Sequence, residues 1–437
     1  MARRRSYRPL DVLLNDRQLG KFGKEAGGGV HFTYDQSWLA WENAIPVSLS
    51  LPLRERRYSG ASVTAVFENL LPDVDQVRKR VAERVGAAGT DAYSLLAEIG
   101  RDCVGALQFL PEDQEPTPTT QINASAVSND DIGNIIANLG RVPLGVGSDN
   151  DMDFRISVAG AQEKTALLYH EDKWMLPHGT TPTTHLIKPQ IGPLPDGPDL
   201  SDSVENEYYG IKLMEAFGMP VNQVAMKQFA GHKVLVIERF DRRWTQDGRL
   251  VRLPQEDCCQ ALSVSPTQKY QSQGGPGIVD IMELLQGSDN PVEDRERFFT
   301  TQLLFWLTGA TDGHAKNFSV FLRPQNSFSL TPLYDVLTLQ PFYDNKQLHR
   351  KFFKLSMSVG ERAQYQIPHI SSEHFFATGR KAGLSKERIR ALVSEVQNRC
   401  ATALQAVENE LPDNFPAYIH DSVKLALIKR LQKLDTE

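Results

Sequence analysis

The chain has 437 residues, of which 41% are hydrophobic and 23% charged, and its formal net charge is −6. This composition indicates a folded globular protein of two or three structural units, and the negative charge argues against autonomous nucleic-acid binding. No apolar run approaches the roughly 18 residues of a membrane-spanning helix, so no membrane partner is expected. The irregular spacing of the four cysteines predicts neither a structural metal nor a redox motif. We therefore expect a cytoplasmic protein with reduced thiols.

Residues 1–111 are predicted to form an α+β subdomain. Strand patterns cover Leu10–Leu14, Val30–Tyr34 and Cys103–Leu110, and helical patterns cover Val63–Leu71, Val74–Val85 and Ala92–Ile99. Residues 112–149 are predicted to be a linker with a short helix, because the polar stretch 111–131 is interrupted by several prolines.

Residues 150–253 have the features of a nucleotide-binding segment. In DFRISVAGAQEKTALL (153–168), two apolar runs flank the small residues 157–161, whose backbone N–H groups could cradle phosphates. Lys188 ends the predicted strand Thr184–Lys188 and is suited to contact the α- and β-phosphates of a nucleotide. Either Glu205 or Glu207, on a helix predicted over 201–217, could pair with Lys188, and the sequence leaves this choice open.

Two further segments could complete a nucleotide site. The β-branched strand Lys233–Phe240 contains Glu238 and Phe240, where backbone groups would bind the adenine edge. Pro266–Ile278 is polar and rich in glycine, which predicts a mobile loop near the nucleotide.

Residues 254–437 are predicted to be mostly helical and to carry the reactive groups. A buried helix over 293–309 ends at Gly309, and the sequence TDGHAKN (311–317) follows it. Strand patterns at Phe318–Leu322 and Phe328–Leu333 then form a predicted hairpin, with its turn at 323–327. The order Asp312, Asn317, hairpin, Asp335 is the order of the catalytic-loop Asp, the Asn five residues later and the metal-binding Asp in protein kinases.

Each residue of this pattern has a chemical role in phosphoryl transfer. Asp312 would accept or orient the proton of the acceptor hydroxyl, and oxygen atoms of Asn317 and Asp335 would hold Mg²⁺. Lys316 and His314 could neutralise charge on the transferred group. The segment therefore predicts ATP-dependent phosphoryl transfer.

Taken together, these motifs closely resemble the HipA family of serine/threonine kinase toxins from bacterial type II toxin–antitoxin modules. The resemblance extends over essentially the whole chain. It is carried by NLLPD (69–73), EIGRD (98–102), DFRISVAGAQEKTALL (153–168), TPTTHLIK (181–188), NEYY (206–209), ERFDRRW (238–244), LPQED (253–257), GGPGI (274–278), GATDGHAKNFSVF (309–321) and LTPLYD (330–335).

The resemblance implies an α+β, two-lobed, protein-kinase-like fold related to phosphoinositide kinases, with an N-terminal α+β subdomain and a mostly helical C-terminal lobe. It implies ATP and Mg²⁺ as cofactors, and self-phosphorylation of Ser157. The phosphate loop would contain Val158, Ala159, Gly160, Ala161 and Gln162. A phosphoserine beside these residues adds nearly two negative charges, which would repel the ATP phosphates and switch nucleotide binding off.

The resemblance also implies macromolecular partners. These are a helix-turn-helix antitoxin dimer of the HipB type, operator DNA bound mainly through that antitoxin in a nucleoid-associated corepressor complex, and a protein substrate of the translation apparatus. An aminoacyl-tRNA synthetase, with glutamyl-tRNA synthetase as the leading candidate, would be phosphorylated and growth would stop. Arg380 and Lys381 are the candidates for contact with DNA phosphates.

Two other functions are compatible with the same residues. Aminoglycoside and choline kinases share the Asp-to-Asn spacing and the later metal-binding Asp, which makes a small-molecule kinase the alternative enzyme. A DNA-bound corepressor that only binds ATP is the non-enzymatic alternative. Transfer of labelled phosphate to Ser157, to a bacterial protein or to a sugar would separate these functions.

Overall fold

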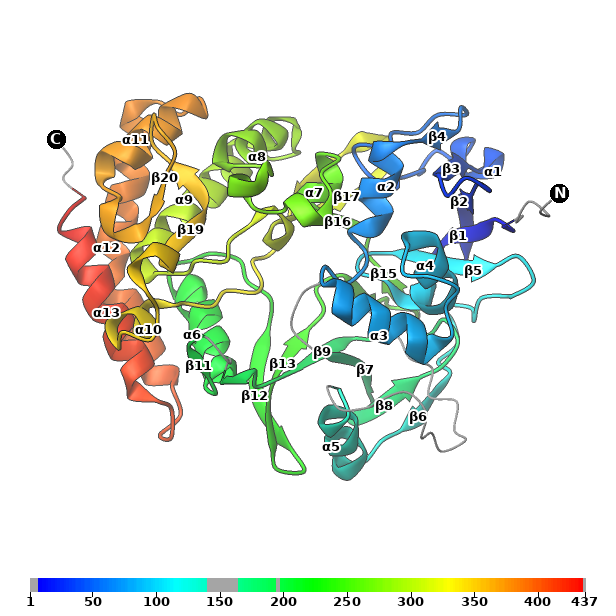
Figure 1. Ribbon diagram of the computed structural model, residues 1–437, viewed down its shortest axis with the longest axis horizontal. Coiled ribbons are helices and arrows are strands. Elements are labelled where there is room, and N and C mark those ends of the chain that lie inside the picture. Colours follow the sequence, from blue (N-terminus) through cyan, green and yellow to red (C-terminus); the bar gives the residue numbers. More distant parts are fainter. Residues whose placement is uncertain (1–6, 140–163, 194–196, 435–437) are drawn as a thin grey trace. The chain divides into compact units, whose positions relative to one another are not determined.

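The computed structural model describes residues 7–139, 164–193 and 197–434 (Figure 1). It contains two compact units, each assembled from separate stretches of the chain. Unit 1 comprises Met1–Pro189, Lys227–Thr267 and Val320–Ser327, and unit 2 comprises Gln190–Met226, Gln268–Ser319 and Phe328–Glu437. The division into four consecutive segments made from the sequence is a different partition and stays a prediction. Within the described ranges, no helix has the length and apolar character needed to cross a membrane.

A five-stranded antiparallel sheet organises the first part of unit 1, in the order β4-β3-β2-β1-β5. Its core includes Phe22, Phe67 and Phe109, whose rings lie 4.2 Å (Phe22–Phe67) and 5.6 Å (Phe67–Phe109) apart. The elements are β1 (Leu10–Leu14), β2 (Arg17–Lys24), β3 (Val30–Tyr34), β4 (Tyr58–Ser59), β5 (Leu107–Pro111), α1 (Gln36–Leu39), α2 (Ala61–Glu68), α3 (Asp75–Val85) and α4 (Ala92–Ile99).

These elements confirm the predicted α+β character of the subdomain, with one correction. The strand predicted over 103–110 begins only at Leu107, because a turn that contains Gly105, with φ of +74°, precedes it. Before that turn, Gly100–Asp102 forms a 3₁₀ turn, η1. That turn directs Asp102 into the interior, where the side chain is fully buried.

The segment predicted to be a linker with a short helix does contain a helix, and it also contributes a strand to unit 1 that was not predicted. Strand β6 (Ala124–Ala126) pairs with β8 (Lys173–Pro177), and the Thr119 N–H donates a hydrogen bond of 2.9 Å to Asp16 Oδ2. Helix α5 (Asn129–Ala137) then begins at a capping box formed by Ser128 and Asp131. Polar composition was misleading here, because β6 is stabilised by pairing with a strand about 50 residues later.

The second sheet of unit 1 has six strands in the order β12-β13-β9-β7-β8-β6. Ile132 and Ile136 of α5 pack on Leu167, Ile187 and Val234, and Figure 1 shows this helix beside the sheet. The remaining elements of this part are β7 (Thr165–His170), β9 (His185–Pro189), β12 (Val224–Phe229, in unit 1 from Lys227), β13 (His232–Glu238), β14 (Arg242–Trp244), β15 (Leu250–Arg252), β16 (Gln255–Asp257) and α7 (Cys258–Ala261).

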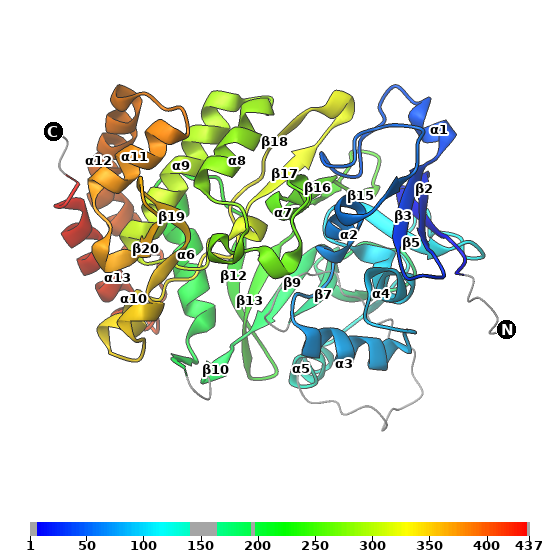
Figure 2. The same ribbon diagram turned by 45° about the horizontal axis from the view of Figure 1, so that its top comes forward.

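Unit 2 is mostly helical and is built around α9, whose residues from Phe298 to Thr308 are all buried. Figure 2 shows α9 near α11, α12 and α13. The elements are α6 (Ser203–Ala216), α8 (Ile278–Leu284), α9 (Pro291–Thr308), α10 (Gln340–Asp344), α11 (Ser372–Lys381), α12 (Lys386–Glu410), α13 (Ala417–Leu431), β10 (Gly192–Pro193), β11 (Asp199–Leu200), β19 (Lys354–Val359) and β20 (Gln364–Gln366). The helices predicted over 201–217 and 293–309 are confirmed as α6 and α9.

Candidate active site

The loop after α9 is held in place before it reaches Asp312. Gly309 ends the helix in the left-handed conformation, with φ of +75°, and the Ala310 N–H donates to Phe305 O at 2.9 Å. Ser356 Oγ, from β19, donates to Thr311 O at 2.7 Å. At Gly313 a Cβ atom would lie 2.4 Å from the Phe305 ring, so only glycine fits there without a shift.

Asp312 and Asn317 are joined directly. The Asn317 side-chain amide nitrogen, Nδ2, donates to the Asp312 carbonyl oxygen at 2.8 Å, and the Asn317 backbone N–H donates to His314 O at 2.9 Å. The Asp312 side chain is 56% exposed, whereas Asn317 is buried. Because Nδ2 is engaged with the loop, the amide oxygen is the Asn317 atom suited to bind a cation.

A hairpin follows the loop, as predicted. Strand β17 (Ser319–Leu322) and strand β18 (Phe328–Leu330) flank the turn, in which the Arg323 N–H donates to Ser327 O at 2.8 Å. The Thr331 N–H donates to Ser319 O at 2.9 Å, so the second strand returns beside the first. The strand ends at Leu330, three residues before the predicted end.

The hairpin returns the chain to the catalytic-type loop through Tyr334, which sequence reasoning did not single out. The Tyr334 hydroxyl donates to Lys316 O at 2.8 Å and lies 2.6 Å from Ser319 Oγ. Asp335, the next residue, is exposed and has a left-handed backbone with φ of +60°. The Tyr334 contacts therefore bring the Asp335 backbone close to the segment that contains Asn317. Tyr334 belongs to the LTPLYD motif, which was the available signal.

The chain after Asp335 is fixed to α6. Asn206 donates through Nδ2 to Thr338 O at 2.9 Å and accepts from the Thr338 N–H at 2.9 Å. A Cβ atom at Gly210 would lie 2.2 Å from Val336 O, so the helix backbone approaches this segment closely. Asn206 lies in the NEYY motif, whose structural role the sequence did not reveal. The two predicted partners of Lys188, Glu205 and Glu207, are both buried on the same helix.

His314 and Lys316 are both buried within the loop. His314 Nε2 lies 4.0 Å from Asp312 Oδ2, and the His314 ring meets the Tyr270 ring edge-on, with centroids 5.0 Å apart. His314 thus borders the Asp312 carboxylate. The predicted role of His314 and Lys316 in neutralising the transferred group stays a prediction.

Tyr270 is the main polar neighbour of the site that the sequence did not indicate. Its hydroxyl donates to Asp312 Oδ1 at 2.8 Å. Tyr270 lies in the glycine-rich stretch 266–278 that was predicted to be a mobile loop. In the structure the loop contains the 3₁₀ turn Gln271–Gln273, and a Cβ atom at Gly275 would lie 1.9 Å from Gln268 O. The loop is therefore tightly folded on itself.

Three residues predicted to bind nucleotide lie in unit 1. Lys188 is on β9 opposite Leu235 of β13 and is 5% exposed. Glu238 ends β13 and is exposed, and the ring of Phe240 meets that of Phe321 edge-on at 5.7 Å. The strands predicted over 184–188 and 233–240 are confirmed as β9 and β13. The nucleotide-binding roles of these residues, and the pairing of Lys188 with Glu205 or Glu207, stay predictions.

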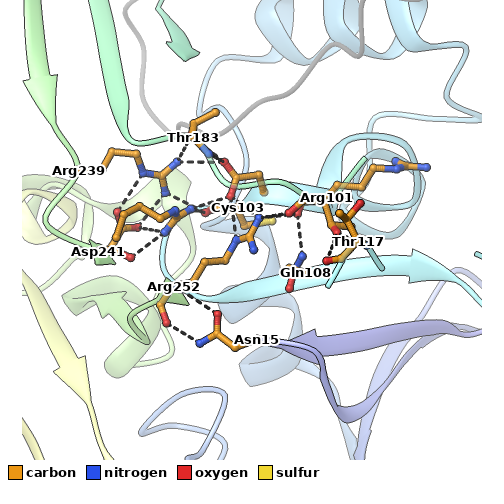
Figure 3. A network of polar contacts seen from close by, with 12 residues as sticks. Asn15, Arg101, Cys103, Gln108, Thr117, Thr183, Arg239, Asp241 and Arg252 are labelled. Atoms are coloured by element: carbon orange, nitrogen blue, oxygen red, sulfur yellow. Dashed lines mark hydrogen bonds and ion pairs between the residues drawn. The ribbon is translucent and has the colours of Figure 1, made fainter. Parts of the chain in front are cut away.

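Buried charged side chains anchor the segment next to Glu238 (Figure 3). We call this group the arginine–aspartate cluster; it consists of Asp102, Arg239, Asp241, Arg242 and Arg252. Arg242 Nη2 lies 2.9 Å and Arg252 Nη2 2.8 Å from Asp102 Oδ1. Arg239 Nη2 lies 2.8 Å from Asp241 Oδ2. The cluster joins the EIGRD motif, through Asp102, to Arg239 and Arg242 of the ERFDRRW motif.

The cluster is held in its charged form. Burial alone would raise the pKa of the Asp241 carboxyl, but the guanidinium groups of Arg239 and Arg242 lower that pKa to about 2. Thr183 Oγ1 donates to Asp102 Oδ2 at 2.7 Å, and the Arg239 N–H donates to Thr184 O at 2.9 Å. The end of β13 is thus bound to the strand that carries Lys188.

The remaining predicted site residues lie outside the described residues or at the surface of unit 2. Ser157, Val158, Ala159, Gly160, Ala161 and Gln162 lie outside the described residues. Arg380 and Lys381 are exposed at the end of α11, where their nitrogens lie 3.8 Å and 3.3 Å from carboxylate oxygens of Glu361. In the ranges that the structure describes, no group of three or more His, Cys, Asp or Glu side chains could hold a metal ion.

A helical unit with an Asp–Asn loop, a hairpin and a second Asp is the arrangement of a protein-kinase-like phosphotransferase. Comparisons with known proteins identify the family. A HipA-like C-terminal domain matches residues 156–404, more than half of the chain, and a HipA N-terminal domain matches residues 10–110. The chain belongs to the HipA family and is a serine/threonine protein kinase of the toxin type found in toxin–antitoxin systems.

Individual relatives extend over nearly the whole chain. The putative kinase Y4mE of Sinorhizobium fredii is 32% identical, covering 96% of each chain. The serine/threonine-protein kinase toxin HipA of Shewanella oneidensis is 27% identical, covering 97% of this chain and 95% of that protein. A solved Shewanella oneidensis complex of HipA, HipB and operator DNA matches with a TM-score of 0.79 and 25% identity, covering 97% of this chain and 96% of the other. The predicted α+β, two-lobed kinase-like fold is confirmed.

Proposed function

We propose that this kinase transfers the γ-phosphoryl group of ATP to serine or threonine hydroxyls, with Asp312 as the group that accepts the hydroxyl proton. The hydrogen bond from Asn317 Nδ2 to Asp312 O is the observation that carries this proposal. It fixes both residues in one loop and uses the Asp312 backbone oxygen, so the exposed carboxylate can face a substrate hydroxyl. It also engages the Asn317 nitrogen, so the amide oxygen is the atom that can face a cation. Proton transfer needs a carboxylate within reach of the acceptor hydroxyl, and positioning supplies most of the catalysis in this reaction class.

The side-chain oxygens of Asn317 and Asp335 are suited to Mg²⁺. The amide oxygen of Asn317 and the carboxylate of Asp335 would bind it, because Mg²⁺ prefers oxygen ligands. It commonly takes only one or two protein carboxylates and completes its shell with water and substrate phosphates. Two protein ligands suffice on this basis, which agrees with the lack of a larger acidic or histidine cluster in the described ranges. Bound Mg²⁺ would supply charge neutralisation for the phosphates, with Lys316 and His314 as the basic groups of the same unit.

We infer that a HipB-type antitoxin dimer neutralises the kinase and carries it to operator DNA. The solved Shewanella oneidensis complex, which contains HipA, HipB and operator DNA, supports this inference. Arg380 and Lys381 would then exchange their contacts with Glu361 for DNA phosphates. The protein substrate would be an aminoacyl-tRNA synthetase, with glutamyl-tRNA synthetase as the first candidate. Self-phosphorylation of Ser157 would switch nucleotide binding off.

Transfer of labelled γ-phosphate from ATP tests the proposal. Purified chain would be incubated with bacterial glutamyl-tRNA synthetase and, separately, with an aminoglycoside. We expect labelled synthetase, a loss of at least about 10³-fold in Asp312→Asn, and unchanged binding of a fluorescent ATP analogue by that variant. Asp413→Asn, at an exposed acid of unit 2, is the matched control. Label on the aminoglycoside alone would establish a small-molecule kinase, and equal transfer by wild type and Asp312→Asn would exclude the catalytic role.

A further inference from the structure

The phenol of Tyr270 is bound to the group proposed to receive the acceptor proton. Tyr270 Oη donates to Asp312 Oδ1 at 2.8 Å, across forty-two positions of sequence. The other carboxylate oxygen, Oδ2, faces His314 Nε2 at 4.0 Å. The two oxygens of Asp312 therefore have different surroundings. A hydrogen bond from a neutral donor to a carboxylate is stronger than one between neutral groups.

The backbone around Tyr270 is fixed on both sides. The N–H groups of Gln273 and Gly275 donate to Tyr270 O at 2.9 Å and 3.0 Å, and the Ala315 N–H donates to Lys269 O at 3.3 Å. Gln271 Oε1 accepts from the Ser358 N–H at 2.6 Å, which fixes the next residue to β19. The hydroxyl is thus presented to Asp312 by a loop bound both to the catalytic-type loop and to the strand behind it.

Because Asp312 is exposed, the hydrogen bond from Tyr270 can set the orientation of its carboxylate. A carboxylate that is 56% exposed can rotate about its terminal torsion, because that torsion has broad minima. The fixed hydrogen bond from the Tyr270 hydroxyl to Oδ1 restricts this rotation. An acceptor hydroxyl must meet the carboxylate in one orientation for efficient transfer, and small misplacements are costly in rate.

We propose that Tyr270 is a positioning residue for phosphoryl transfer: its hydroxyl holds Asp312 Oδ1 and so orients the carboxylate that accepts the proton of the substrate hydroxyl. The inference rests on the proposed role of Asp312. It means that the glycine-rich stretch 266–278 acts on the substrate hydroxyl, through Asp312, rather than on the nucleotide. Loss of the hydroxyl should therefore slow transfer without changing the affinity for ATP.

Two substitutions separate the hydroxyl from the ring. Tyr270→Phe removes only the donor and keeps the edge-on contact with His314, whereas Tyr270→Ala removes both. The matched control is Tyr418→Phe, since Tyr418 Oη donates to Asp202 Oδ2 at 2.9 Å in the same unit. The measurements are single-turnover transfer of labelled phosphate from ATP to dephosphorylated casein and displacement of a fluorescent ATP analogue.

We expect Tyr270→Phe to slow transfer about tenfold or more, with ATP affinity unchanged within about twofold, and Tyr418→Phe to change neither. In an Asp312→Asn background, Tyr270→Phe should have no further effect, because the two residues act as one unit. Wild-type transfer by Tyr270→Phe together with slow transfer by Tyr270→Ala would overturn the proposal in favour of ring packing. Faster transfer by Tyr270→Phe would overturn it as well, by showing that the hydroxyl obstructs the acceptor. Undiminished transfer by Asp312→Asn alone would instead refute the proposed function.

Discussion

Arg252 Nη2 lies 2.8 Å from Asp102 Oδ1 in the interior of unit 1, where the two side chains are 1% and 0% exposed. The residues are 150 positions apart and belong to β15 and the turn η1. Arg252 Nη2 also donates to Thr180 O at 2.7 Å, which extends the contact to the segment before β9. A buried guanidinium is tolerated only when carboxylates and carbonyl groups compensate for its lost hydration. The contacts of Arg252 therefore hold together β15, the turn η1 and the segment before β9.

Replacing Asp102 by asparagine should strongly destabilise the protein. The substitution keeps the shape of the side chain but removes the negative charge that faces Arg242 and Arg252. We expect the free energy of unfolding to fall by about 3–5 kcal/mol, measured by urea denaturation. Asp247→Asn is the control, because Asp247 pairs with Arg249 at the surface, where water screens the pair, and this variant should unfold at nearly the wild-type urea concentration. Equal stabilities for the two variants would contradict this reading of the arginine–aspartate cluster.

A buried acid should give stability a negative dependence on pH. Burial raises the pKa of the Glu256 carboxyl from 4.5 to about 8, although the Leu49 N–H, 2.7 Å from Oε1, opposes the shift. Between these pH values the folded chain keeps a proton that the unfolded chain has released. The free energy of unfolding therefore falls as pH rises, by up to about 1.4 kcal/mol per pH unit, until the folded carboxyl also ionises.

Urea denaturation between about pH 5 and pH 8 checks this slope. Glu256→Gln carries no titrating proton and should show a flatter dependence on pH than the wild type. Glu55→Gln, at an exposed position of the same unit, should keep the wild-type slope. Parallel curves for wild type and Glu256→Gln would show that the Glu256 carboxyl does not set the slope.

A methyl group added at Gly275, in the glycine-rich stretch 266–278, should displace Tyr270 and so disturb Asp312. The Cβ of Gly275→Ala would lie 1.9 Å from Gln268 O and 2.9 Å from Tyr270 O, so the backbone must move. We expect a loss of stability of about 1–3 kcal/mol and slower phosphate transfer. Gly27→Ala, where no atom lies within 4 Å of the added carbon, should preserve both. Wild-type transfer by Gly275→Ala would mean that the loop geometry is unimportant for the reaction.

Replacing Asp335 by asparagine should preserve the fold and impair phosphate transfer. Asn and Asp both tolerate the left-handed backbone found at this position, whose φ is +60°. Asp335→Asn would therefore keep the thermal unfolding temperature and remove one charge from the proposed Mg²⁺ site. We expect transfer to fall at least about 100-fold at limiting Mg²⁺ and to recover partly as Mg²⁺ is raised. An unaltered Mg²⁺ requirement would exclude Asp335 as a ligand.

Local signals explain why part of the site could be read from the sequence. Helix α9 has a proline in its first turn and a run of apolar residues, and Gly309 follows its last residue, so its bounds are set by neighbours along the chain. Asp312 and Asn317 lie in one short loop, and their contact needs no distant partner. The hairpin places Tyr334 beside Lys316 through a turn of five residues. Spacing and periodicity therefore predicted α9, the Asp–Asn loop and the hairpin, whereas the fold class was implied by the resemblance to a known family.

Only the tertiary structure could reveal the contacts made by distant segments. Tyr270 looks like an ordinary loop residue until its hydroxyl meets Asp312, and Arg252 looks like a surface arginine until Asp102 compensates for its burial. Strand β6 likewise lies in a polar stretch and becomes a strand because β8 pairs with it. Residue type and local pattern report what a segment prefers when surrounded by water. A buried charge or an isolated hydroxyl acquires its role from the partner that replaces that water, and the partner is chosen by the packing of the whole unit.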